Sequence, residues 1–293
     1  MRGRAPYLVV LWAMASVLIG GCNRAEAPAE NTAMPLEDHV HLLLYGSEKT
    51  CDDDTHCSGT VCQANRCVGV LTANEPWLQK RIAKSVAKTL LKEQALRSAV
   101  LEILRNGLKN DHPNVAKKAR VIPLVEELGE VKLLREVADS KHELLGGQAA
   151  LALCRLGKSD ALDRCAALTE SDDLAVAVDA LQSLGQSGKD EALGPLIRTL
   201  NPELDRMLLR AAIEALGRLN DPRAIRPLVT FHGKAPDYLI DSTTRVLRSL
   251  TGAPHGQNHA AWTAWIQANK PVEAPNVELR VVSSEAILGI PEP

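Results

Sequence analysis

Hydrophobic positions recur at fixed spacing through the second half of this 293-residue chain. Three segments agree slot for slot when each is aligned on its last leucine: Ala149-Ala152-Leu153-Leu156, Ala177-Ala180-Leu181-Leu184 and Ala212-Ala215-Leu216-Leu219. The offsets place all four slots within about 100° of arc on an α-helix. Each segment is therefore predicted to form an amphipathic helix whose apolar stripe carries alanines, so that a neighbouring helix can approach closely.

Each of these segments is followed by a turn and by a second apolar segment. The second segments share a pair of apolar positions: Leu162 and Cys165, Leu193 and Leu196, and Ile225 and Leu228. Leu134 and Val137 form a fourth pair, after the looser copy of the first pattern that begins at Val121. Looser copies of the first pattern begin at Val121 and Thr243, which gives five copies spaced by about 28 to 35 residues. Helix, turn, helix is therefore the predicted repeating unit.

The turns carry residues that favour helix boundaries. In Leu219-Asn220-Asp221-Pro222 the aspartate suits the N-cap position. Proline is tolerated directly after it, because its missing N–H costs no hydrogen bond there. Pro123 and Pro227 are expected inside helices, where each would remove a backbone hydrogen bond and kink the helix.

The segment LGRLNDPRAIRPLV carries a resemblance to a known family. A short acidic turn followed by Pro-x-Ala-Ile-x-x-Leu resembles HEAT repeats of the bacterial type, related to those of the phycobilisome lyases. The resemblance covers roughly residues 115–270 and implies an all-α fold, an α-solenoid of helical hairpins that are stable only when stacked. We assign residues 75–270 to this HEAT-like repeat domain, with 77–108 as a hairpin of poor repeat character.

The end of the array is predicted to be a cap. Trp262 and Trp265 lie one turn apart and are expected to cover the last core layer, with an exposed aromatic docking site as the alternative. Residues 271–293 show no helical period and are assigned to a C-terminal tail. Within it, 279–282 either pair as a strand or are irregular.

Two cysteines in the repeats are placed by the alignment. Cys165 occupies a slot that Val137 and Leu196 fill elsewhere, so it is predicted to be buried. Cys154 is equivalent to Glu126 and is expected to face away from the core. These opposed directions argue against a disulfide between the two, whereas an even number of cysteines after lipidation argues for one.

The N-terminus carries signals of export. Arg2 and Arg4 precede an apolar stretch that is shorter than the roughly 20 residues of a spanning helix. Leu18-Ile19-Gly20-Gly21-Cys22 then resembles the bacterial lipobox. The resemblance implies a lipoprotein signal peptide over residues 1–21, cleavage before Cys22, and a diglyceride and a palmitate on that cysteine. The alternative is an ordinary secretory signal or a short anchor.

The residue after the lipidated cysteine is Asn23 rather than Asp, which in lipoproteins implies the outer membrane. We therefore expect a lipid-anchored protein of the cell envelope, on either the periplasmic or the surface face. Residues 22–50 are assigned to the lipid attachment site and a tether, because 23–35 offer almost nothing to bury. A short helix is predicted at 36–45.

Four cysteines, Cys51, Cys57, Cys62 and Cys67, follow within 17 residues and define a cysteine-rich module at 51–68. In an exported chain they predict two disulfides, because so short a segment cannot build its own core. It resembles a four-cysteine module of exported bacterial proteins. Three pairings are possible, and spacing does not choose among them. The alternatives are a structural zinc site, although the paired CxxC spacing is absent, and calcium binding by Asp52–Asp54.

Composition and motifs narrow the function. The formal net charge of -2 gives no bias towards nucleic acid, and aromatic residues make up only 3%, which favours packed helices over a β-sandwich. The chain contains no GxSxG, HExxH or phosphate-binding glycine loop. We therefore expect no enzyme activity, no cofactor and no metal site.

One cluster of charge stands out in the first predicted hairpin. Lys80, Lys84 and Lys88 recur at every fourth position and form a basic ridge. The simplest interpretation is a solvated helix face. The functional interpretation is contact with lipid phosphates or with an anionic partner.

Together these patterns predict a membrane-tethered HEAT-repeat scaffold. It would bind another envelope protein through the concave surface of its second helices, without catalysis. One alternative is an enzyme accessory similar to the HEAT-type lyases. Another is a structural envelope lipoprotein that contacts lipid head groups. Export argues against a nucleic-acid partner.

Overall fold

The computed structural model describes residues 36–50, 57, 60–63, 66–72, 75–109 and 115–280. The chain divides into two compact units, residues 1–106 and 107–293, which are described one by one. The predicted signal peptide, the lipidation site Cys22, Cys51 and residues 281–293 lie outside the described residues. Among the residues described, no helix has both the length and the apolar character needed to cross a membrane.

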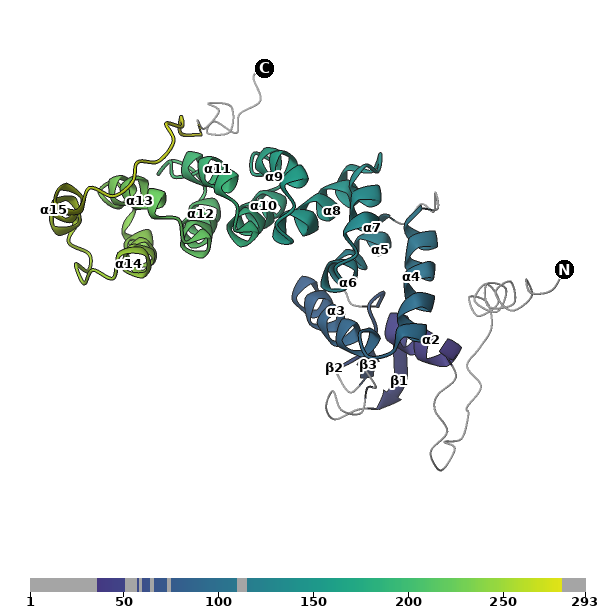
Figure 1. The fold of residues 1–293 in the computed structure, drawn as a ribbon. Coiled ribbons are helices and arrows are strands. Elements are labelled where there is room, and N and C mark those ends of the chain that lie inside the picture. Colours follow the sequence, from purple (N-terminus) through teal and green to yellow (C-terminus); the bar gives the residue numbers. More distant parts are fainter. Residues whose placement is uncertain are drawn as a thin grey trace, which may run out of the picture. The chain divides into compact units, whose positions relative to one another are not determined.

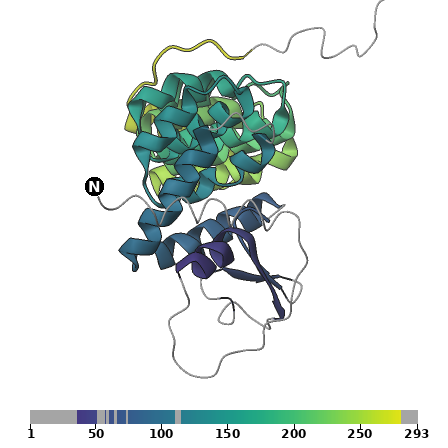
Figure 2. The ribbon, with the colours of Figure 1, turned by 90° about the vertical axis from the view of Figure 1, so that its right-hand side faces the viewer.

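The N-terminal unit combines helices with a small antiparallel sheet. Its elements are α2 (Leu36–Tyr45), β1 (Gly46–Thr50), β2 (Val61–Gln63), β3 (Arg66–Val68), α3 (Pro76–Leu90) and most of α4 (Gln94–Lys109). Strand β3 is central, with β1 and β2 on its two sides, and Figure 2 shows the strands beside α2. The predicted helix at 36–45 is confirmed as α2. The sheet was not predicted, because strands of three to five residues are too short to show an alternating pattern.

Two glycines allow α2 and the sheet to meet closely. Gly46 has a φ of +79°, and a Cβ there would lie 2.1 Å from the carbonyl oxygen of Cys67. A Cβ on Gly69 would lie 2.3 Å from the backbone nitrogen of Gly46. Residues 36–50, which the sequence analysis assigned to the tether, are therefore built into the folded unit.

The C-terminal unit, residues 107–293, is a row of short helices, and we call it the repeat unit. Its elements are α5 (Val115–Ala119), α6 (Ile122–Glu127), α7 (Val131–Ala138), α8 (Glu143–Arg155), α9 (Leu162–Leu168), α10 (Leu174–Ser187), α11 (Leu193–Arg198), α12 (Arg206–Leu219), α13 (Ile225–His232), α14 (Asp237–Thr251) and α15 (His259–Asn269). From α9 onward, Figure 1 shows two layers. We call α8, α10, α12 and α14 the first-helix layer, and α9, α11 and α13 the second-helix layer.

The first-helix layer is packed as the repeat pattern predicts. Ten of the twelve residues in the three aligned segments are buried, and Leu156 and Leu219 are half-buried. The most extensive helix contact is between α10 and α12. A Cβ on Gly185 of α10 would lie 2.6 Å from the Cα of Ala215 in α12, so only glycine permits this approach.

The helix boundaries follow from the caps. Asp173 accepts hydrogen bonds from two amides at the start of α10, and the side chain of Asp221 accepts one from the amide of Arg223, as predicted. The loss of a backbone hydrogen bond expected at Pro123 and Pro227 does not occur. Pro123 is the second residue of α6 and Pro227 the third of α13, where a backbone N–H has no partner within the helix.

A buried arginine joins three successive first helices. The Arg155 side chain is 7% exposed, and its guanidinium donates to both carboxylate oxygens of Glu126 (2.8 and 2.7 Å), to Asp179 (3.3 Å) and to the Ser183 hydroxyl (2.8 Å). Burial alone would lower the pKa of Arg155, but the hydrogen bond and charge of Glu126 raise it above its usual range. The arginine therefore stays charged and links α6, α8 and α10.

Candidate interaction surface

The second-helix layer is built differently from the first. Each second helix begins with a 3₁₀ turn, at Ser159–Ala161, Asp190–Ala192 and Pro222–Ala224, whose last alanine is buried. The predicted apolar pairs, such as Leu193 with Leu196, are buried beneath it. The helices that follow contain only six to eight residues, so their ends leave backbone carbonyls close to the surface.

Arginine and aspartate side chains fix the turns of this layer. Arg223 lies 2.9 Å from Asp190 of the preceding repeat and 2.5 Å from Asp221. Hydrogen bonds from Arg223 lower the pKa of Asp221 below its usual range. Arg135 donates to Asp160 at 2.7 Å in the same way, and this hydrogen bond lowers the pKa of Asp160. These pairs hold the turns of successive repeats in register.

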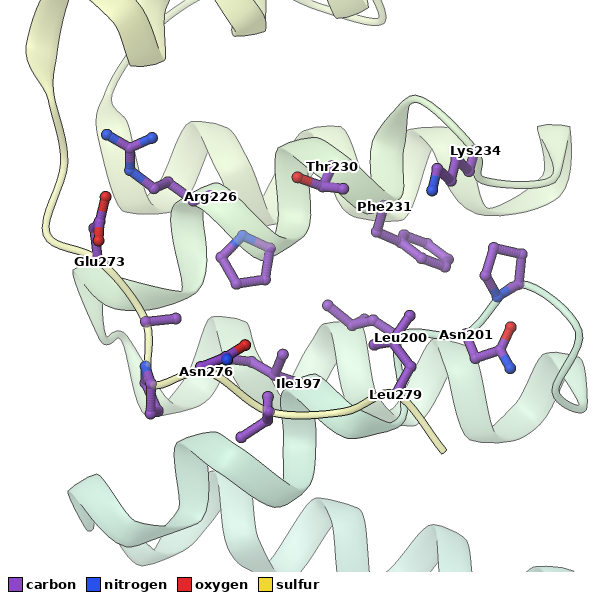
Figure 3. A pocket seen from close by; sticks show the side chains of 15 residues that line it. Ile197, Leu200, Asn201, Arg226, Thr230, Phe231, Lys234, Glu273, Asn276 and Leu279 are labelled. Atoms are coloured by element: carbon purple, nitrogen blue, oxygen red, sulfur yellow. The ribbon is translucent and has the colours of Figure 1, made fainter. Parts of the chain in front are cut away.

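An open groove of about 720 Å³ is lined by residues of α11, of α13 and of the C-terminal segment 273–279. Figure 3 shows Ile197 of α11 and Leu200, which follows α11, on one side of it and Thr230 and Phe231 of α13 on the other. The lining also includes charged and polar groups: Arg226, Lys234, Asn201 and Glu273. Such a mixture of an apolar floor with a few polar groups suits a side chain or peptide better than a metal ion.

The chain continues past α15 along this layer. The Arg226 side chain donates to the Pro271 carbonyl at 3.2 Å, and a Cβ on Gly194 would lie 3.6 Å from Val277. The Arg280 amide donates to the Arg198 carbonyl at 2.7 Å. Residues 271–280 therefore lie across α13 and α11 without regular secondary structure, and Figure 1 shows them in yellow above these helices.

Arg280 is the most heavily bonded residue of this segment. Its guanidinium donates to the Thr169 carbonyl, at the end of α9, at 2.7 Å. Its own carbonyl accepts a hydrogen bond of 2.9 Å from the Asn201 side chain. The Asn201 side-chain oxygen accepts from the Glu203 amide at 3.1 Å, so the carboxamide is held on both sides. Described residues of the predicted tail are therefore bound to the repeats, and none forms a strand.

The predicted basic ridge lies on α3 of the N-terminal unit. Lys80, Lys84 and Lys88 are all exposed, while Leu78 and Ile82 on the other face are buried. The three lysines are thus available on one face, and their proposed contact with anions stays a prediction.

In the cysteine-rich module, Cys57 and Cys67 are at disulfide distance, with their sulfur atoms 2.21 Å apart. Cys62 is also disulfide-bonded. No group of three or more His, Cys, Asp or Glu side chains suited to a metal ion lies within the described residues.

Cys154 corrects the alignment. Cys165 is buried as predicted, but Cys154 is fully buried too, and both are free thiols. A hydrogen bond with Cys154 and burial raise the pKa of the Cys165 thiol. Cys154 is buried because α8 is covered by α5, α6, α7, α9 and α10. This helix therefore has no solvent face at the position that Glu126 occupies in α6.

At the end of the array, Trp262 is fully buried and Trp265 half-buried, as expected of a cap. The Trp262 ring nitrogen donates to the Gly256 carbonyl at 2.8 Å. Behind it, His232 is buried, with its Nε2 atom 3.2 Å from the Thr244 hydroxyl. The prediction of a core-covering role is confirmed for Trp262.

Two features of the repeats were not predicted from the sequence. Arg155 was not singled out, although it falls on the repeat pattern, with Glu126 and Ser183 about one repeat away on either side. The contact of residues 271–280 with the second-helix layer could not be found by periodicity, because an extended segment held by backbone hydrogen bonds has none. Val277, Leu279 and Arg280 were the available signal.

Residues 164–248 match a family model described as HEAT repeats. The match runs from α9 into α14 and includes α11 and α13, which line the groove. A comparison with curated proteins gave no match. This part of the chain is therefore a HEAT-like helical repeat scaffold.

Proposed function

We propose that this protein is a non-catalytic scaffold, lipid-anchored through Cys22 in the cell envelope, that binds a partner protein on its second-helix layer. The observation that carries the proposal is the contrast between the two layers. First helices pack on one another, whereas α11 and α13, together with the segment 273–279, line an open groove of apolar and charged side chains.

Several features support binding rather than catalysis. The groove holds no pair of acid and base side chains in hydrogen-bond contact, among the residues described. Asn201 follows α11 and Arg226 lies in α13, so two successive repeats contribute polar groups to the groove, while Glu273 belongs to the C-terminal segment. Repeat scaffolds of this kind expose extended faces because each unit contacts only its neighbours.

The decisive experiment is affinity capture from envelope extract with the full chain in detergent. Charge reversal in the groove, Arg226→Glu with Lys234→Glu, is expected to reduce partner recovery by about tenfold or more. The matched control is Arg210→Glu with Arg245→Glu, because both residues are exposed on first helices. Equal loss in both variants, or loss only in the control, would show that the surface is misassigned.

Lipid anchoring is tested separately, by mass measurement of the mature chain. Two or three acyl chains are expected on Cys22, and a Cys22→Ser variant should be released from membranes. A mature chain of unmodified mass would refute the anchor and leave the scaffold proposal standing.

A further inference from the structure

The hydrogen bonds that hold residues 271–280 are mostly backbone hydrogen bonds. The carbonyl of Pro271 and both the amide and the carbonyl of Arg280 are bonded to the second-helix layer. Hydrogen bonds to the backbone do not depend on side-chain identity, so another extended chain could form the same ones. The side-chain contacts include those of Ala274 and Val277, which pack against the apolar core, and that of the Arg280 guanidinium.

The acceptors on the repeats belong to helix ends. Arg198 is the last residue of α11, and Thr169 directly follows the last residue of α9. Carbonyls at a helix C-terminus have no partner within the helix and carry the negative end of its dipole. The amide of Arg280 donates to the C-terminal end of α11 and its guanidinium to that of α9, and these two helices belong to successive repeats.

The segment leaves part of the surface open. Residues 273–277 and Leu279 line the groove together with residues of α11 and α13, and Leu279 is 47% exposed. Figure 3 shows the backbone passing along the edge of the groove rather than through it. The resident segment is thus a partial occupant, and a partner could make all of its contacts and additional apolar ones.

We propose that the second-helix layer is a binding groove for an extended peptide and that residues 271–280 are its built-in occupant. The ligand chemistry is a branched apolar residue three positions before an arginine, as in Val277 and Arg280. A partner segment of this kind displaces the resident one. The inference deepens the proposed function, on which it rests for the existence of a partner.

Competition within one chain is strong. A short flexible connection gives an attached segment an effective concentration of about 1 mM. If the sequence of the resident segment binds the groove with an intrinsic dissociation constant well below that value, the segment occupies the groove in the wild-type chain. A free peptide of the same sequence must then displace it. Weakening the resident segment should reveal the site.

The experiment measures binding of a fluorescent peptide with blocked ends, PVEAPNVELR, to the full chain by anisotropy. An opened variant, Val277→Asp with Arg280→Ala, is expected to bind the peptide about tenfold more tightly than the wild type. Adding Asn201→Asp to the opened variant should weaken binding about tenfold, because it removes the donor to the arginine carbonyl. That substitution keeps the oxygen that accepts from the Glu203 amide, so the turn is preserved.

A peptide that carries Ala in place of its arginine is the matched probe and should bind weakly to the opened variant. Equal affinity of wild type and opened variant would overturn the proposal. So would an opened variant that does not bind, or an Asn201→Asp change without effect. Peptide binding without partner capture would refute the proposed function alone, and partner capture without peptide binding would refute this inference alone.

Discussion

The two layers of the repeat unit differ in how closely their helices are packed. In the first-helix layer, α10 and α12 approach so closely that a methyl group on Gly185 has no room. In the second-helix layer, a methyl group on Gly194 would make an ordinary contact of 3.6 Å with Val277. The first-helix layer is thus closely packed, whereas the helices of the second-helix layer are short and make fewer contacts with one another.

The largest effect is expected from a methyl group in the closed layer. Gly185→Ala should destabilise the repeats by about 3 kcal/mol and lower Tm by roughly 5–10 °C, because backbone of α12 must shift. Gly194→Ala in α11 is the matched control and should be neutral or slightly stabilising, since alanine favours a helix over glycine. Thermal unfolding of both variants measures the difference. Equal destabilisation would contradict the distinction between the layers.

Removing the buried arginine should have the next largest effect. Arg155→Met leaves Glu126 and Asp179 without their cation and is expected to cost about 2–3 kcal/mol in denaturant unfolding. The control Arg210→Met removes an exposed arginine from α12, whose ion pair with Glu214 should contribute less than about 1 kcal/mol. If the two variants unfolded at the same urea concentration, the network would be of no importance to stability.

Acid should weaken the C-terminal end through His232. Burial, and secondarily the charge of His259, lower the pKa of His232 in the folded chain from its ordinary 6.5. Below pH 6.5 the unfolded state therefore binds a proton that the folded state does not. This contribution to stability is complete above that pH and is lost on acidification, by up to about 1.4 kcal/mol per pH unit.

The variant His232→Gln separates this effect from general acid unfolding. It removes the titrating group and should flatten the dependence of unfolding free energy on pH between 6.5 and the folded-state pKa. An unchanged slope would show that another group is responsible.

The smallest effect belongs to the bound segment. Arg280→Ala should change global stability by less than about 0.5 kcal/mol, because residues 271–280 lie on the finished surface. Hydrogen exchange is the sensitive measurement, since residue 280's amide donates to Arg198 and should lose protection. Large global destabilisation would mean that the segment is part of the core.

The parts of the fold that the sequence predicted are those governed by periodicity. Alanine and leucine slots identified the first helices, and Asp221 with Pro222 identified a boundary, because a cap depends on local geometry alone. The slot of Cys154 failed for the opposite reason. Its burial depends on how many helices surround α8, which no local pattern records.

The candidate surface was predicted only in part. The second helices were predicted as the interaction surface, and this stays a prediction, but Asn201 and Arg226 were not singled out, because both lie outside the apolar slots. Asn201 and Arg226 form hydrogen bonds with residues that lie 79 and 45 positions further along the chain. Contacts over such separations, made by an aperiodic segment, become visible only in three dimensions.

The arrangement of Arg155 has a mechanical consequence. The Arg155 guanidinium pairs with a carboxylate across the interface of α8 with α6 and with another across the interface of α8 with α10. Separation of either interface therefore leaves a charge without its partner. Pulled from its ends, such an array should not peel off one hairpin after another at α6, α8 and α10. A single rupture event for these three helices is expected in force spectroscopy, and Arg155→Met should turn it into separate steps.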